Sequence, residues 1–127
     1  MREKRQVLTT TSQTTGSFLE SVVLYAAAPY DGSTIGSSLI GFMPTSRGTV
    51  KLNTTNPVDA PIIDPQYYTT NVDRYAMRTG MRALAKMMQN TPEGEAFIES
   101  ETVPAGFVPS LNATDAELDG YVQATTG

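Results

Sequence analysis

The sequence predicts an α+β fold in which an antiparallel β-sheet is backed by about three α-helices. Three observations support this. The first half of the chain holds short apolar runs separated by turn-forming residues, as strands do. Residues 70–90 have the apolar spacing of an amphipathic helix. Residues 114–117 form a capping box, which predicts the start of another helix.

The chain length fits one domain. Its 127 residues are enough to bury a hydrophobic core and too few for two well-packed ones. We therefore assign residues 1–127 to a single domain. Residues 1–16 are polar and are expected to form a peripheral arm or an arm exchanged between subunits.

The first strand is predicted within residues 17–28. This run, SFLESVVLYAAA, is apolar with β-branched residues at its centre, and fits either a buried strand or a short helix. We favour the strand. The PYDGST run at residues 29–34 combines proline, aspartate and glycine and predicts a turn.

A second strand is predicted over residues 35–43. Alternation would place Ser38, Ile40 and Phe42 on one of its faces. The opposite face also carries apolar side chains, so we expect both faces to be at least partly covered.

Pro44 is expected to end the second strand, and the SRG run after it predicts a chain reversal. The third strand would follow over residues 49–53, TVKLN, with Val50 and Leu52 pointing inward. The second and third strands would then form an antiparallel hairpin. Two prolines predict a loop over residues 54–61, before a short extended segment over residues 61–65.

Three helices are predicted in the second half of the chain. The first spans residues 70–90, capped by Thr70 or Asn71. One stripe of this helix would be core and contains Met77, Met81, Leu84 and Met88. The second helix would begin at residues 91–92, where a proline can occupy the first helical position. The third would begin at the capping box.

Composition argues against several classes of partner. The net charge is −4, and every charged residue from Glu93 onward is acidic, so nucleic acid is not expected to bind. No apolar run approaches the roughly 20 residues of a membrane span, so the membrane is not an expected partner and the protein is expected to be soluble. The polar residues after MREKRQ do not form a signal-peptide core, which predicts a cytoplasmic protein if Met1 is the native start.

Two residue types are absent from the sequence. Without cysteine there is no thiolate nucleophile and no zinc–thiolate site. Without histidine there is no imidazole base, no hydrolase triad and no common transition-metal ligand, so no metal site is expected. The glycines do not form a GxGxxG or GxxxxGK[ST] phosphate-binding fingerprint.

Several motifs occur in an order that resembles a known family. SRGTVKL is followed by DAPIIDPQYY, NVDRYAMRTGMRAL, ESETVPAG and TDAELDGYV. Together they are similar to the carboxy-terminal substrate-binding region of the glucose-methanol-choline (GMC) family of FAD-dependent oxidoreductases, especially its fungal members. The resemblance runs from about Gly36 to the last residue. It implies a sheet that lies over the flavin of a separate FAD-binding domain, with Ser38, Ile40 and Phe42 facing the substrate.

Two parts of the family pattern are missing from these residues. Family members have an amino-terminal glycine-rich FAD fingerprint, and a catalytic histidine just beyond the segment that corresponds to YVQATTG. Because hydride transfer needs a flavin and a base, we expect no redox activity from the chain alone. No cofactor is expected in the isolated chain, although the full-length family uses FAD.

Two functions remain open. The first is a small-molecule-binding domain for an organic alcohol or a secondary metabolite, acting beside a separate FAD-binding domain. The alternative is a free-standing, cofactor-independent cyclase or isomerase that orients a fungal polyketide- or terpenoid-like metabolite.

Further site candidates each have a structural alternative. Asp64 is either a general acid or a turn former, and Arg47 either contacts substrate or holds neighbouring carbonyls. Tyr67 and Tyr68 are either pocket donors, with Tyr67 a weak catalytic candidate, or packing residues. The remaining substrate-binding candidates border the predicted turn and are Tyr25 and Tyr30.

Two further expectations concern surfaces. A substrate domain without its flavin partner would expose apolar surface, which predicts a homodimer. The sequence also contains two glycosylation sequons, Asn53-Thr54-Thr55 and Asn112-Ala113-Thr114, which matter only if the chain is secreted.

Overall fold

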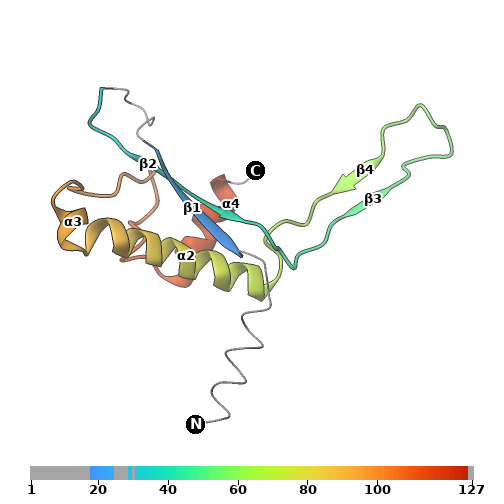
Figure 1. The fold of residues 1–127 in the computed structure, drawn as a ribbon. Helices are drawn as coiled ribbons and strands as arrows, with labels where there is room; N and C mark the ends of the chain where they lie inside the picture. Colours follow the sequence, from blue (N-terminus) through green and yellow to red (C-terminus); the bar gives the residue numbers. More distant parts are fainter. Residues whose placement is uncertain (1–17, 25–28, 30, 126–127) are drawn as a thin grey trace, which may run out of the picture.

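The computed structural model describes residues 18–24, 29 and 31–125 and has an α+β fold, as predicted (Figure 1). Its elements lie in the order β1 (Leu19–Leu24), β2 (Gly36–Gly41), β3 (Thr49–Lys51), β4 (Ile62–Asp64), α2 (Asn71–Gln89), α3 (Pro92–Glu95) and α4 (Asp115–Thr125). The predicted turn is confirmed over residues 31–33. None of the helices in this described part is both long and apolar enough to span a membrane.

The strands form two separate antiparallel pairs. β1 pairs with β2, with Leu19 opposite Gly41 and Leu24 opposite Gly36. β3 pairs with β4, with Thr49 opposite Asp64. The predicted hairpin between the second and third strands is therefore wrong, because β2 and β3 belong to different sheets.

The residues between β2 and β3 explain this difference. The SRG run does not turn β3 back onto β2, because Ser46 is buried and its backbone and hydroxyl are hydrogen-bonded to Asp73 of α2. The chain is thus held at the start of α2 before it enters β3. β2 instead pairs with all six residues of β1.

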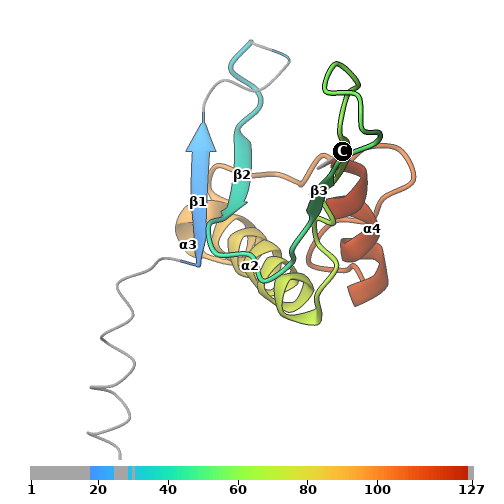
Figure 2. The same cartoon turned by 90° about the vertical axis from the view of Figure 1, so that its right-hand side faces the viewer.

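The β1–β2 sheet packs against α2 through a glycine. Leu19 and Leu39 place their δ carbons against Gly80, within 3 Å of where a Cβ would stand. Gly41 lies next to the sulfur of Met77. Leu19, Leu39 and Gly41 therefore mark the face of the sheet that is turned toward α2. Figure 2 shows the β1–β2 pair with α2 on one side of it.

The long central helix matches its prediction closely. The Thr70 hydroxyl accepts a hydrogen bond from the backbone N–H of Asp73 and caps the helix. The predicted stripe of Met77, Met81, Leu84 and Met88 is half-buried. α2 contacts β1, β2, α3 and α4, which makes it the element around which this part of the chain is organised.

The two shorter helices also begin where the sequence predicts. Thr91 caps α3, with Pro92 in its first turn. At α4, Thr114 and Glu117 form the expected reciprocal capping box. Leu118 and Val122 of α4 are the most deeply buried apolar side chains, and Leu118 is only 1% exposed. The core of the described chain therefore lies between α2 and α4.

The β3–β4 pair forms an arm, residues 49–64, that extends away from the rest of the protein (Figure 1). Among the described elements, β3 and β4 contact only each other. The prediction that Val50 and Leu52 point inward is wrong, since they are 70% and 85% exposed. Apolar and polar residues do alternate along β3, but no other described helix or strand packs against the arm.

Gly48 lets the two chains of the arm approach each other closely at its base. A Cβ on this glycine would stand 2.3 Å from the carbonyl oxygen of Asp64 and 2.5 Å from that of Pro65. Both atoms belong to the backbone, so they cannot move aside as a side chain could. A side chain at residue 48 would therefore push β3 and β4 apart.

We expect Gly48→Ala to lower the free energy of unfolding by about 1–3 kcal/mol, the usual cost of overpacking. The measurement is urea unfolding followed by circular dichroism. Gly120→Ala in α4 is the matched control, because a Cβ there meets nothing within 4 Å. It should be neutral or stabilising by up to about 1 kcal/mol, since alanine favours a helix. Equal stability of the two variants would contradict the close approach at Gly48.

Candidate functional site

Alternation places Ser38, Ile40 and Phe42 on the face of the β1–β2 sheet that is turned away from α2. Ile40 is 43% exposed and Phe42 is 52% exposed. We call this surface the outer face. It consists of Phe18, Glu20, Val22, Leu24, Ser38, Ile40 and Phe42.

The outer face is apolar along most of its length. Its two phenylalanines lie on neighbouring chains, where the backbone N–H of Phe42 donates to the carbonyl of Phe18 at 3.1 Å. Among the described residues of this surface, Ser38 contributes a hydroxyl and Glu20 contributes a carboxylate. Such a surface can bind the apolar part of an organic molecule and offer it a hydrogen bond. The tyrosines predicted to border it, Tyr25 and Tyr30, lie outside the described residues.

Arg47 holds the backbone beside it. Its Nη1 donates to the carbonyl oxygens of Pro44 at 2.6 Å and Ser46 at 2.9 Å. This is the structural role that the sequence left open for Arg47. A substrate contact by this exposed arginine stays a prediction.

Asp64, Tyr67 and Tyr68 follow one another closely but lie in different surroundings. Gln66 and Tyr68 both have left-handed backbone conformations, at φ 49° and 60°, which are strained for residues other than glycine. Between them Tyr67 is 73% exposed. Asp64 is also exposed and accepts a hydrogen bond from Gln66 at 2.7 Å. The catalytic roles considered for Asp64 and Tyr67 stay predictions.

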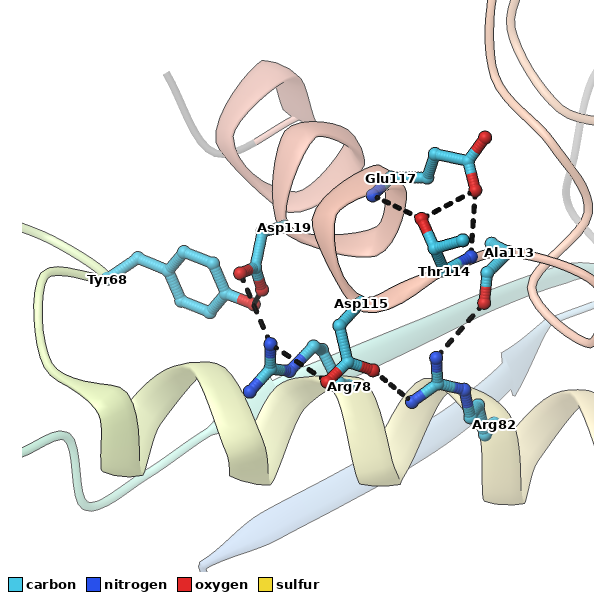
Figure 3. A network of polar contacts seen from close by, with 8 residues as sticks. All are labelled: Tyr68, Arg78, Arg82, Ala113, Thr114, Asp115, Glu117 and Asp119. Carbon is cyan, nitrogen blue, oxygen red and sulfur yellow. Dashed lines mark hydrogen bonds and ion pairs between the residues drawn. The ribbon is translucent and has the colours of Figure 1, made fainter.

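Tyr68 is buried and joins a polar network between α2 and α4 (Figure 3). Its hydroxyl donates to Oδ1 of Asp119 at 2.7 Å. Nη1 of Arg78 lies 3.4 Å from Oδ2 of Asp119 and 3.2 Å from Oδ2 of Asp115. Nη1 of Arg82 lies 2.8 Å from Oδ1 of Asp115. The network therefore joins α4 to α2 and also to the turn that precedes α2.

The environment keeps Tyr68 protonated. Burial, followed by the hydrogen bond to Asp119 and the charge of that carboxylate, raises the pKa of Tyr68 well above its ordinary value. A phenol in this state can donate a hydrogen bond but cannot serve as a base near neutral pH. Its donor position is already used by Asp119, so in this structure Tyr68 orients α4.

A second polar centre surrounds Asp73. Its carboxylate accepts hydrogen bonds from the backbone N–H groups of Thr45 at 2.7 Å and Ser46 at 2.8 Å. It also accepts from both of their hydroxyls. The Ser46 oxygen in turn accepts from the N–H groups of Thr69 and Thr70. We call this arrangement the Asp73 cradle.

The cradle stabilises the charged form of Asp73. Burial by itself raises the pKa of the carboxyl, but the hydrogen bonds from Ser46 and Thr45 outweigh burial and hold the pKa below its ordinary value. Asp73 lies in the first turn of α2, where the helix dipole also favours a negative charge. The local sequence does not reveal that this side chain binds the segment before β3.

The spacing of the charged residues is only a partial signal of this network. Arg78 and Arg82 are four residues apart, and so are Asp115 and Asp119. Two arginines four residues apart lie on the same side of one helix, and two aspartates four residues apart lie on the same side of another. The two pairs can therefore meet where the helices pack together. The carboxyl groups of Asp115 and Asp119 were nevertheless missed, because no local signal indicates which helices are neighbours.

Residues 44–127 match the family model described as GMC oxidoreductase. Over 96 residues the chain is 41% identical to the "GMC-type oxidoreductase acuG" of Aspergillus aculeatus, covering 75% of this chain and 18% of that protein. It is 32% identical over 107 residues to the "Oxygen-dependent choline dehydrogenase" of Vibrio vulnificus, covering 84% of this chain and 18% of that protein.

A third relative is the "Pyranose dehydrogenase" of Agaricus campestris, which is 28% identical over 95 residues, covering 75% of this chain and 15% of that protein. The chain thus spans less than a fifth of the length of these relatives. No solved structure is significantly similar to it.

Asp73→Asn should lower the free energy of unfolding by about 1–3 kcal/mol at neutral pH, because buried donors lose their charged acceptor. The folded pKa of Asp73 lies below the unfolded value of about 4, so its contribution is present above that pH and is lost as the pH falls. Urea unfolding at several pH values should therefore show a steeper acid loss for the wild type than for the variant. Glu99→Gln, at an exposed residue, is the control and should retain the wild-type pH dependence.

Tyr68→Phe should cost about 0.5–1.5 kcal/mol, the net value of one hydrogen bond. The folded pKa of Tyr68 is raised, so its contribution is complete below the unfolded pKa of about 10 and is lost as the pH rises. The variant should lose less stability than the wild type between neutral and strongly alkaline pH. Tyr75→Phe, at an exposed tyrosine of α2, should behave as the wild type. An identical alkaline loss in Tyr68→Phe would contradict the assigned network.

Proposed function

Since the chain belongs to the GMC oxidoreductase family, we propose that it is the small-molecule-binding part of such an enzyme and acts beside a separate FAD-binding domain. The match covers 84 residues, from 44 to 127, which is about two thirds of the chain. The substrate class that we infer is an organic alcohol or a secondary metabolite with an apolar body.

The outer face of β1–β2 carries this proposal. It is a mostly apolar sheet surface that carries the hydroxyl of Ser38 and the carboxylate of Glu20, and no described helix or strand packs on it. An isolated two-stranded sheet is marginally stable in water, and exposed apolar surface of this kind usually has a partner. A substrate held between this face and a flavin-bearing domain would support the two-stranded sheet and would cover its apolar surface.

The residues of this chain do not by themselves fit FAD. The sequence lacks a glycine-rich phosphate-binding turn. On α2, Arg74 donates to the carbonyl of Tyr68, while Arg78 and Arg82 pair with carboxylates of α4. These cations are thus already engaged, and we assign the cofactor to the separate domain, where it would accept the hydride of the alcohol.

The chain's own contribution would be binding and orientation. Ile40 and Phe42 would remove water from the apolar part of the substrate, and Ser38 would fix its direction through a hydrogen bond. This proposal differs from the cyclase or isomerase alternative, for which Asp64 and Tyr67 would be the acid–base candidates. Both side chains are exposed, so no enclosed geometry favours that chemistry.

Phe42→Ser should weaken the binding of apolar alcohols to the purified chain by about tenfold, equivalent to about 1.4 kcal/mol. The reason is the loss of a large apolar contact on the outer face. NMR titration with a panel of aliphatic and aromatic alcohols measures the effect. The largest shifts in the wild type should come from β1 and β2.

Phe97→Ser is the matched control. Phe97 is 83% exposed and lies outside the outer face, just after α3, so its removal should leave the affinity unchanged. Equal effects of the two variants, or shifts located away from β1 and β2, would refute the outer face as the binding surface. Reduction of a dye by the chain alone in the presence of an alcohol would refute the need for a separate FAD-binding domain.

The exposed apolar surfaces also support the inference of a homodimer when the chain is isolated. The outer face is the surface concerned, and a second copy of the chain could cover it. A single monomeric species in light scattering at millimolar concentration would contradict this inference.

A further inference from the structure

Asn53 occupies an exposed bend in the arm, two residues after the end of β3. It begins the sequon Asn53-Thr54-Thr55, in which the asparagine side chain is the acceptor and the threonine hydroxyl two residues later is required. Both Asn53 and Thr55 are exposed. The proposed substrate-binding surface lies on a different sheet, so the binding of small molecules does not account for this sequon.

The bend is folded by other side chains. The Thr54 hydroxyl donates to Asp59 at 2.5 Å, and Asn56 donates to the same carboxylate at 3.2 Å. The Asn56 side chain also accepts from the N–H of Val58 at 3.2 Å. No hydrogen bond among the described residues uses the side chain of Asn53 or Thr55. The two groups that a glycosylating enzyme must recognise are therefore accessible without breaking the loop.

The second sequon, Asn112-Ala113-Thr114, lies in a different environment. The Thr114 hydroxyl donates to Glu117 at 2.7 Å and accepts from its N–H as part of the cap of α4. Ala113 is buried, and its carbonyl accepts from Nη2 of Arg82 at 3.0 Å. Recognition of this sequon would require breaking both the helix cap and a contact between α2 and α4.

We propose that Asn53 is an N-glycosylation site whenever the chain passes through a secretory pathway, and that Asn112 is not. The donor is a lipid-pyrophosphate-linked oligosaccharide. A bond forms between Nδ2 of Asn53 and the anomeric carbon of the sugar, and the bond from that carbon to the pyrophosphate oxygen breaks. The amide nitrogen loses one proton, and the lipid pyrophosphate leaves.

The surroundings of Asn53 suit a glycan. Its neighbour Leu52 is 85% exposed, and Val58 across the bend is 87% exposed. Neither is covered by another described residue, and a hydrated oligosaccharide at Asn53 would shield both from other molecules. Glycosylation also requires that this part of the arm faces solvent, even when other surfaces of the chain are covered by a partner.

The test is to express the whole chain behind a cleavable secretory leader in yeast and to analyse cells and medium together. Treatment with an endoglycosidase should produce one downward step in electrophoretic mobility. Mass spectrometry of the treated protein should find the residual sugar on Asn53. Because the sugar is added before export, the readout does not depend on how much protein reaches the medium.

Matched variants locate the modification. Asn53→Gln and Thr55→Ala should each abolish the mobility step, since either change removes the sequon. Asn112→Gln should leave it unchanged. A wild-type chain with no step, a step that survives Asn53→Gln, or a sugar found on Asn112 would each overturn the proposal.

Discussion

The carboxylate of Asp73 is the constraint on which the rest of the described structure depends. A buried charge is tolerated only when several donors satisfy it, and the segment at Thr45 and Ser46 supplies them from backbone and hydroxyl groups. This contact fixes the segment that follows β2 to the first turn of α2. Since Ser46 also receives the N–H groups of Thr69 and Thr70, the turn before the helix is held at the same point.

We call the contact between Asp73 and the Thr45–Ser46 segment the anchor. It has different consequences for the chain on its two sides. On one side, β2 and its partner β1 lie against Gly80 of α2, which leaves their outer face uncovered. On the other side, the chain leaves the anchor as the arm and returns through the strained turn at Gln66 and Tyr68. Tyr68 then reaches Asp119 and so links the anchor to α4. Packing between α2 and α4 encloses the small apolar core around Leu118.

A core of this size agrees with membership in a family whose members are much longer. The chain covers less than a fifth of the relatives described above, and both of its sheets have only two strands. The FAD-binding domain that we propose as the partner of the outer face is a physical explanation for that apolar surface as well as a functional one.

The sequence by itself determined the local elements. The spacing of the methionines indicated α2, the capping box indicated the start of α4, and alternation placed Ser38, Ile40 and Phe42 on one face of a strand. Each of these depends on interactions between residues a few positions apart. Only the tertiary structure decided that β2 pairs with β1 and that no described element covers Val50 and Leu52. It also decided that Tyr68 makes its hydrogen bond to α4. Strand partners, buried charges and ion pairs between helices join residues that are 11 to 51 positions apart. The energies that select them arise only when the chain is packed.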